Sequence, residues 1–480
     1  MGGLGRHAPA LLIGALVWLS CVWFGAWEWN PNSATRLFAA LSIVEQGDAT
    51  IDEYAPLTID KAQFGRHFYL DKAPGVTLMA LPAVAFADLA TGQRAHDLEI
   101  AKYAPSFERF LRWRMRIATA LGAALLTALA AMALLDWGRA LGGSPGAGAV
   151  AALAFALGTP MWGWSTSLFG HAPVAALWVI AAWAIWRGTR GERASPMLAG
   201  VAGLALGWAV VVDYAAVLGG GVIALWALWR LRRFGVPWRP IAAAVAAGVA
   251  ALVVLLGYNL FAFGTPFRLG YQGVVGFEGM QQGLFGLTYP KLTVLYEITL
   301  GLRRGLIWVA PVLVPALAGV WLLLARRETR DIGVLVVAIA VLMLGYNASY
   351  AYWDGGNSTG PRHLVPMIGF VALGLAPLWR LRWSRPVVVP VLAASIGLNL
   401  VIAAAEIASG GDGRFPLWED VIRDRFLPGA LRTLPSEWFG WPAWSGLYAY
   451  VALAVLLTAA LLVALRNGAA APSPATVAHG

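Results

Sequence analysis

Apolar runs of about 20 residues recur along the whole chain, and short polar segments separate them. A run of this length can cross the roughly 30 Å hydrocarbon core of a bilayer as an α-helix. Hydrophobic residues make up 59% of the 480 positions, which is more apolar surface than a water-soluble core of this size could bury. The sequence therefore predicts a polytopic membrane protein.

The composition favours α-helices over a transmembrane β-barrel. The chain contains 55 glycines and 24 tryptophans, as expected for helices that pack closely in lipid and carry aromatic residues at their ends. A barrel would instead show short segments of alternating polarity. We predict an all-α bundle of about 12–13 transmembrane helices. The apolar runs lie near residues 8–27, 75–91, 115–135, 147–164, 168–186, 197–213, 215–229, 240–262, 305–325, 332–350, 364–379, 386–407 and 446–465.

Three basic loops indicate the orientation of the chain, because lysine and arginine concentrate in cytoplasmic loops. These loops are residues 230–239, 326–330 and 380–385. The segments predicted on the opposite, extracytoplasmic side are 263–304, 351–363 and 408–445. The basic loops place the C-terminal tail in the cytoplasm, whereas a full crossing by every run would place it outside. One early run, 75–91 or 147–164, is therefore predicted not to cross as a full helix.

The remaining global features exclude several classes of protein. Basic residues concentrate in the loops named above, so the net charge of +10 indicates orientation and not a nucleic-acid partner. The only cysteine, Cys21, excludes an intramolecular disulfide and a cysteine-based metal cluster. We find no nucleotide-binding motif and no metal-ligand set, and we expect no cofactor and no metal. The run 8–27 is predicted to be a retained first helix, and residues 468–480 a disordered tail.

Residues 30–74 form an unusually charged segment, with six acidic and four basic side chains in a chain that is 12% charged overall. We predict that it is an extracytoplasmic active-site loop with short interfacial helices, including an amphipathic helix within 33–47. At its end, Asp71 and Lys72 lie at the start of an apolar run. A lysine there can contact a phosphate, and the adjacent carboxylate can deprotonate a hydroxyl. The charges that a solvated surface explains more simply are Asp48, Asp60 and Lys61.

A second polar motif, YWDGGNSTGPRHLVP at 352–366, brings together Asp354, Asn357, Arg362 and His363. Its glycines allow backbone N–H groups to approach an anion, and the arginine and histidine add positive charge at a helix N-terminus. The motif is suited to binding a lipid-linked phosphate. The alternative is a tight glycine-rich turn whose cations extend to the membrane surface.

Several ionisable residues next to apolar runs are further candidates. Arg303 and Arg304 lie on the side opposite the basic loops, and one of them is predicted to contact the donor phosphate. His171 and Asp213 lie within apolar surroundings, where ionisable groups are candidates for function. Each could face a substrate cavity or form hydrogen bonds between helices.

Two aromatic segments on the extracytoplasmic side have two interpretations each. Residues 263–304, rich in glycine and aromatic side chains, could stack on sugar rings or shelter a prenyl chain, or could be an interfacial loop. Residues 414–444, rich in tryptophan, could be an acceptor platform or a membrane anchor.

The order of these features resembles the GT-C superfamily of polyprenyl-phosphate-sugar glycosyltransferases. It looks closest to the family 39 type, which includes protein O-mannosyltransferases and lipid A aminoarabinose transferases. The resemblance rests on NPNSATR at 30–36, GRHFYLDKAPG at 65–75 and the WDGG…GPR element. It implies that Lys72 contacts the donor phosphate, and it places Asp213 and Tyr214 in the cavity.

Two departures from the family pattern affect the predicted site. The family usually has an Asp-Glu pair where this chain has Asn32 and Ser33, so the base would have to be Asp71, Asp52 or Glu53. The second proline of the family element is replaced by glycine.

The resulting prediction is a membrane glycosyltransferase that transfers a sugar from a polyprenyl-phosphate donor to an acceptor hydroxyl with inversion. The predicted partners are the lipid-linked donor, membrane lipids and an acceptor that is a protein, a lipid or a polysaccharide. The predicted location is the bacterial inner membrane, with the active site facing the exterior. The alternatives are a transporter or flippase of lipid-linked saccharides, and an oligosaccharide polymerase or ligase.

Overall fold

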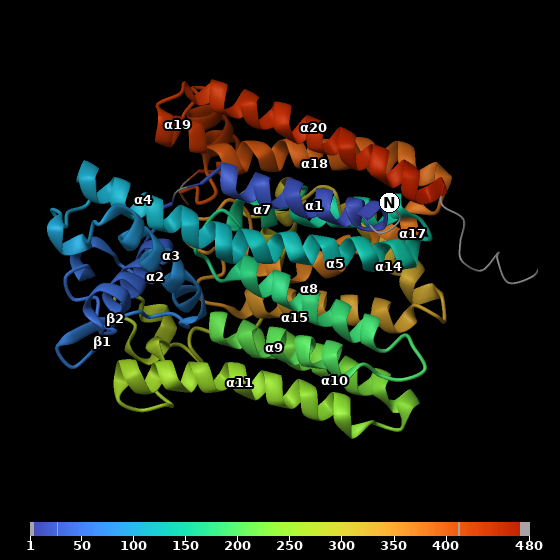
Figure 1. Ribbon diagram of the computed structural model, residues 1–480, viewed down its shortest axis with the longest axis horizontal. Coiled ribbons are helices and arrows are strands. Elements are labelled where there is room, and N and C mark those ends of the chain that lie inside the picture. Colours follow the sequence, from blue (N-terminus) through green and yellow to red (C-terminus); the bar gives the residue numbers. More distant parts are fainter. Residues whose placement is uncertain (1–3, 26, 411–412, 471–480) are drawn as a thin grey trace, which may run out of the picture.

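The computed structural model describes residues 4–25, 27–410 and 413–470, and these form a bundle of roughly antiparallel helices (Figure 1). In this part of the chain, five helices are long and apolar enough to cross a membrane, and six shorter apolar helices accompany them. The longest continuous helix runs from Pro105 to Gly142. The predicted all-α polytopic membrane fold is confirmed.

The helices of the bundle follow one another in chain order. They are α1 (Leu4–Trp23), α4 (Pro105–Thr119), α5 (Leu125–Gly142), α6 (Pro145–Ala156), α8 (His171–Gly188), α9 (Pro196–Val212), α10 (Ala216–Leu231), α11 (Trp238–Phe263), α14 (Leu313–Ala325), α15 (Arg330–Ser349), α16 (Val365–Ala372), α17 (Leu375–Trp379), α18 (Arg385–Ala405) and α20 (Ala443–Ala470). Shorter elements connect or cover them, namely α2 (Pro31–Leu41), β1 (Ala62–Phe64), β2 (His67–Tyr69), α3 (Gly75–Thr91), α7 (Met161–Trp164), α12 (Leu292–Thr299), α13 (Leu306–Val309) and α19 (Leu434–Phe439).

The two ends of the bundle differ in the segments that they carry. The end with the N-terminus carries the basic loops 230–239, 326–330 and 380–385, and we call it the basic end (Figure 1). The other end, which we call the polar end, carries α2, α3, the β1–β2 hairpin and α19 (Figure 1). α20 starts at the polar end and runs to the basic end, where the described chain stops at Ala470. The predicted tail 468–480 lies outside the described residues from 471 onward.

α3 does not cross the bundle, and this explains the inconsistency in the predicted crossings. Gly75 at its start contacts the backbone of Val211 and Val212 at the end of α9. Asp88 near its other end pairs with Arg114 on α4. α3 therefore lies beside α2 and the outer part of α4 at the polar end (Figure 1). The sequence predicted that one of two runs, 75–91 or 147–164, does not cross as a full helix, and α3 corresponds to the first of them.

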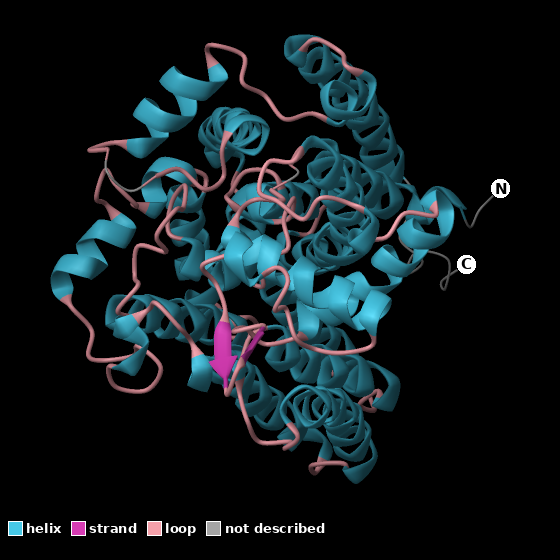
Figure 2. Ribbon diagram, turned by 90° about the vertical axis from the view of Figure 1, so that its left-hand side faces the viewer, coloured by secondary structure: helices cyan, strands magenta, loops and turns pink. Residues whose placement is uncertain are grey.

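The polar end is a cap of short helices and loops that includes the β1–β2 hairpin (Figure 2). β1 and β2 form an antiparallel hairpin in which Ala62 faces Tyr69, and Ala62 also bridges to Val274 in the segment that follows α11. The N–H of Thr359 donates to the carbonyl of Ile407 at 2.8 Å. Residues 32–41 of α2 are all buried. The helix predicted at an interface is thus enclosed, because α3 and α4 pack against it.

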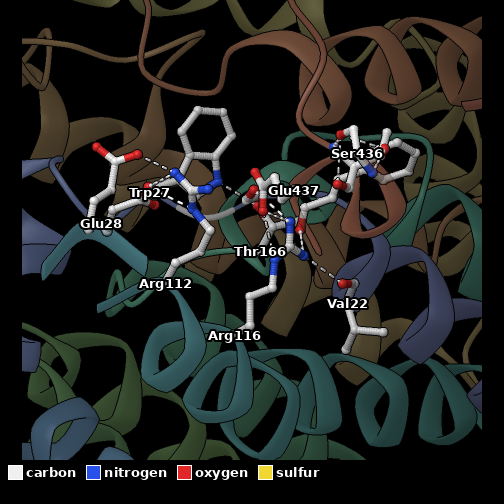
Figure 3. Close-up of polar contacts among 12 residues, drawn as sticks. Val22, Trp27, Glu28, Arg112, Arg116, Thr166, Ser436 and Glu437 are labelled. Carbon is white, nitrogen blue, oxygen red and sulfur yellow. Dashed lines mark hydrogen bonds and ion pairs between the residues drawn. The ribbon is translucent and has the colours of Figure 1, made fainter. Parts of the chain in front are cut away.

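Buried ion pairs attach α19 and the end of α1 to α4 (Figure 3). Arg116 pairs with Glu437 and donates to three carbonyl groups near the end of α1. One turn earlier, Arg112 pairs with Glu28 at 2.8 Å and with Glu108. Both arginines satisfy several acceptors at once, as buried charges require. These contacts hold segments that are more than 300 residues apart in the sequence.

Close helix contacts in the bundle depend on glycine. A Cβ on Gly319 of α14 would overlap the backbone of Gly374, which lies between α16 and α17. A Cβ on Gly203 of α9 would likewise overlap the backbone of Ala244 on α11. Small residues let helix backbones approach closely in lipid, where packing replaces the hydrophobic effect as the main attraction.

Replacing Gly319 with alanine is expected to lower the free energy of unfolding by about 1–3 kcal/mol, because the backbone of Gly374 has to move. The matched control is Gly345→Ala on α15, where an added Cβ meets no atom within 4 Å. Alanine there is expected to be neutral or to stabilise the helix by roughly 0.5–1 kcal/mol. Thermal unfolding of the detergent-solubilised variants measures both, and equal midpoints would refute the packing argument.

Candidate functional site

A cavity of about 260 Å³ opens at the polar end between three segments of the chain. One wall comes from the first polar segment, a second from the segment after α11, and a third from the glycine-rich loop after α15. The lining residues are Asn30, Pro31, Asn32, Ile59, Asp60, Asp71, Lys72, Tyr271, Val274, Phe277, Met280, Tyr350, Tyr352, Gly355, Gly356, Asn357 and Arg362. Both polar motifs singled out in the sequence thus meet in one space.

Lys72 lies between two carboxylates in this cavity. Its Nζ pairs with Asp71 and lies 3.3 Å from Oδ2 of Asp60. Asp71 is 1% exposed, and its Oδ1 has no hydrogen-bond partner. Burial raises the pKa of Asp71 above its ordinary value; Lys72 opposes this shift, and Asp60 adds to it. The site therefore presents a carboxylate oxygen that is free to accept a proton.

Backbone contacts fix the position of this pair. β2 ends at Tyr69, and the chain then enters α3 at Gly75, where a Cβ would come within 2.6 Å of the backbone of α9. On the other side, a Cβ on Gly270 would come within 2.6 Å of the carbonyl oxygen of Leu70. Glycine at both places lets α9 and the segment after α11 pack directly against the segment that carries Asp71 and Lys72.

The glycine-rich loop positions Arg362 on the opposite wall. Gly355 has φ +73°, and a Cβ there would come within 2.9 Å of Nε of Arg362. The Nε of Arg362 has no hydrogen-bond partner, and its guanidinium lies 5.0 Å from the centre of the Phe169 ring. The arginine is thus held by packing while part of its hydrogen-bonding capacity remains available for a ligand.

Arg304 shapes this loop from behind and does not line the cavity. It is 1% exposed and donates to the carbonyls of Asp354 at 2.9 Å and Gly356 at 2.7 Å. Burial lowers the pKa of Arg304 to about 10, and the neighbouring Arg303 contributes to this shift. Arg303 pairs with Asp354 at 3.0 Å. One of these two arginines was predicted to contact the donor phosphate. The structure instead places both against the loop that carries Arg362, outside the lining of the cavity.

Aromatic side chains cover much of the remaining wall. Tyr271 and Phe277 come from the segment 263–304, while Tyr350 and Tyr352 come from the end of α15 and the loop after it. Tyr352 packs edge-on against Phe277, with ring centres 5.6 Å apart, and its hydroxyl accepts from the N–H of Gly279. An amphipathic aromatic wall of this kind is suited to contacting sugar rings or an apolar chain.

The structure brings some predicted site residues together and separates others. Those that line the cavity are Asp71, Lys72, Asn357 and Arg362. Asp52 and Glu53 lie outside it, since Asp52 pairs with His67 on the hairpin at 2.6 Å and Glu53 bonds to Gln46. Neither of these two carboxylates is placed to act as the base.

The predicted cavity residues His171 and Asp213 line a second, smaller space of about 30 Å³. His363, which was predicted to bind the donor phosphate, lines this second space and not the main cavity. The two histidine rings meet edge-on, with centres 5.0 Å apart. Asp213 caps the end of α9 and accepts from the N–H of Ala215 at 3.0 Å. Tyr214 packs against Tyr271, with ring centres 5.2 Å apart, so it supports the aromatic wall of the main cavity.

Sequence analysis missed Asp60 and Arg36. Asp60 is 8% exposed and faces Lys72, although we expected it on a solvated surface. Arg36 is buried in α2, where it donates to the carbonyl of Asn32 at 2.8 Å and interacts electrostatically with Asp71. No spacing rule connects these residues, because the hairpin and α2 bring them together only after the cap has folded.

The fold and the site define the class: a polytopic all-α membrane protein with a charged cavity at one end. In particular, the chain is similar to ArnT from Cupriavidus metallidurans bound to undecaprenyl phosphate, at 16% identity and a TM-score of 0.50. That match covers 98% of this chain and 74% of ArnT. The same ArnT in the apo state matches at 14% identity and a TM-score of 0.49, over 96% of this chain and 73% of ArnT.

At this level of identity the likeness establishes the fold alone. No protein-family model matches the sequence, and no curated protein matches it either. The assignment of a reaction therefore depends on the residues of the cavity.

Arg304→Gln is expected to lower the free energy of unfolding by about 1–3 kcal/mol, because the carbonyls of Asp354 and Gly356 lose their charged, buried donor. Arg303→Gln is the control, since the Arg303 side chain is 37% exposed and its ion pair contributes about 0–1 kcal/mol. Thermal unfolding compares the two variants. A loss in Arg303→Gln as large as that in Arg304→Gln would contradict the assigned role.

Proposed function

We propose that this protein is a glycosyltransferase that transfers a sugar from a polyprenyl-phosphate-linked donor to an acceptor hydroxyl. The observation that carries this proposal is the cavity in which Asp71, with an unpartnered Oδ1, adjoins Lys72 and faces Arg362. Group transfer from a phosphate-linked sugar needs a base for the acceptor and cations for the departing phosphate. The cavity contains both.

Lys72 and Arg362 bind the donor phosphate in this proposal. They belong to opposite walls of the cavity, so a phosphate between them would be contacted from two sides. Asp60 lies 3.3 Å from the ammonium group of Lys72 and helps to position it. As the bond between the anomeric carbon and the phosphate oxygen breaks, negative charge accumulates on the phosphate, and the two cations stabilise it.

Asp71 acts as the base in this proposal. Its free Oδ1 accepts the proton of the acceptor hydroxyl while the acceptor oxygen forms a bond to the anomeric carbon. The lipid phosphate leaves from the opposite face of the sugar, so the configuration at that carbon is inverted. Burial favours the neutral form of Asp71, which makes its carboxylate a stronger base than an exposed one.

The arrangement of the chain and the likeness to ArnT support a lipid-linked donor. The cavity lies at the end opposite the basic loops, which is the extracytoplasmic end under the positive-inside rule. ArnT of Cupriavidus metallidurans was solved bound to undecaprenyl phosphate. We propose a lipid of this class as the carrier, a bacterial inner-membrane location, and an acceptor that is a protein, a lipid or a polysaccharide.

Asp71→Asn is expected to reduce the release of polyprenyl phosphate from an undecaprenyl-phosphate-linked sugar by at least about 100-fold, because the base is lost. Arg362→Ala is expected to weaken donor binding and turnover together. The assay uses purified full-length protein, an added acceptor extract from the cell envelope and detection of free polyprenyl phosphate.

The matched control for this assay is Asp52→Asn, which removes a carboxylate of the same segment that lies outside the cavity. It is expected to retain activity. Full turnover by Asp71→Asn would eliminate the proposed base, and movement of the intact lipid-linked sugar across a bilayer without its cleavage would favour a flippase.

The activity is expected to fall at acidic pH as Asp71 becomes protonated, with a midpoint above the ordinary aspartate pKa because burial raises the pKa of Asp71. Asp60 contributes to raising this pKa, so Asp60→Asn is expected to move the acidic limb of kcat/KM to lower pH. Asp52→Asn serves again as the control and should leave the limb in place. An unchanged limb in Asp60→Asn would exclude Asp71 as the titrating group.

A further inference from the structure

A second large cavity, of about 250 Å³, lies between α8, α9, α10 and α11 at the basic end. It is lined almost entirely by apolar side chains. The lining residues are Ala184, Ile185, Gly188, Thr189, Ala194, Ser195, Ala199, Ala202, Gly203, Leu206, Ala224, Ala227, Leu228, Leu231, Pro240, Ile241, Ala244 and Val245. None of them contributes to the cavity at the polar end.

Small side chains create this space. Half of the lining positions are alanine or glycine, and at Gly203 the backbones of α9 and α11 approach too closely for a Cβ. Two larger lining residues, Leu228 and Val245, are 47% and 58% exposed, so the cavity is accessible from the outer surface of the bundle. On a membrane-spanning bundle this surface faces lipid.

Arginines surround the end of the cavity that is nearest to the basic loops. Four of them directly follow or precede a lining residue in the sequence, namely Arg190 beside Thr189, Arg193 beside Ala194, Arg232 beside Leu231 and Arg239 beside Pro240. All four are exposed. The nearby Asp331 does not neutralise them, because it pairs with Arg230. Glu192 is an acidic residue in the same turn as Arg190 and Arg193.

We propose that this cavity binds one acyl chain of an anionic phospholipid while the arginines contact the phosphate of its headgroup. The positive-inside rule explains arginines at this end, but it does not explain an apolar cavity that opens between them. The combination matches the two parts of a phospholipid, an apolar chain and an anionic phosphate. The site is separate from the donor cavity because the two lie at opposite ends of the bundle.

The headgroup contacts determine the affinity of this site, and the cavity determines its location. A lipid chain that leaves the bilayer for the cavity moves between two apolar environments, so it gains packing and little hydrophobic free energy. An arginine near an anionic membrane surface, in contrast, attracts the lipid directly. The site is therefore expected to distinguish lipids by charge more strongly than by chain length.

Native mass spectrometry of the full-length protein, with phosphatidylglycerol or phosphatidylethanolamine of identical chains added, tests the proposal. Phosphatidylglycerol is expected to bind more tightly. Arg190→Gln combined with Arg193→Gln is expected to weaken phosphatidylglycerol binding about 30-fold, which corresponds to about 2 kcal/mol. The control is Arg326→Gln with Arg327→Gln, a pair in another basic loop, which should retain the affinity.

Ala227→Phe, which fills the cavity, is expected to weaken phosphatidylglycerol binding, because the acyl chain loses the position that brings its headgroup to the arginines. Its control is Leu225→Phe, a substitution on the exposed face of the same helix. Equal binding of the two lipids, equal losses in the two arginine pairs, or unchanged binding in Ala227→Phe would each overturn the proposal. Displacement of the bound lipid by polyprenyl phosphate would also overturn it, because the cavity would then hold the donor chain. If Ala227→Phe fails to fold, the paired arginine substitutions still test the proposal, because both arginines lie in an exposed loop.

Discussion

Backbone hydrogen bonding inside hydrocarbon is the constraint on which this architecture depends. A bilayer core offers no water to satisfy free N–H and C=O groups, so the spanning segments have to be helices. The β1–β2 hairpin lies at the polar end of the bundle (Figure 2). Non-helical backbone beside the middle of α18 is enclosed by protein, where Ser395 donates to the carbonyl of Gly158 and accepts from the N–H of Val312.

Burial of charge in the cap at the polar end requires compensation, and the compensation produces the site. Lys72 is satisfied by Asp60 and Asp71, whereas Arg304 is satisfied by backbone carbonyls of the loop that carries Arg362. Breaking such contacts leaves a buried charge without a partner, which is costly. Oδ1 of Asp71 remains unpaired among these groups, and an unpaired buried carboxylate oxygen is suited to accept a proton from a substrate.

The sequence led correctly to some residues of the cavity and not to others. Asp71, Lys72 and Arg362 were recognisable because each stands where a polar motif meets an apolar run. Asp60 was not recognisable, since it looks like any other acidic residue of a polar loop. Arg304 stood out in the sequence because its predicted side of the membrane is opposite to that of the basic loops. The groups that its side chain contacts, however, depend on the path of the loop that carries Arg362. Local composition contains no information on such contacts.

The sequence by itself determined the membrane class and the helical bundle, because hydrophobic length is a local property of the chain. Only the tertiary structure decided that α3 stays in the cap, that Asp52 and Glu53 point away from the cavity, and that Asp60 faces Lys72. These outcomes depend on close backbone contacts, such as that of Gly75 with α9, between segments that are far apart in the sequence.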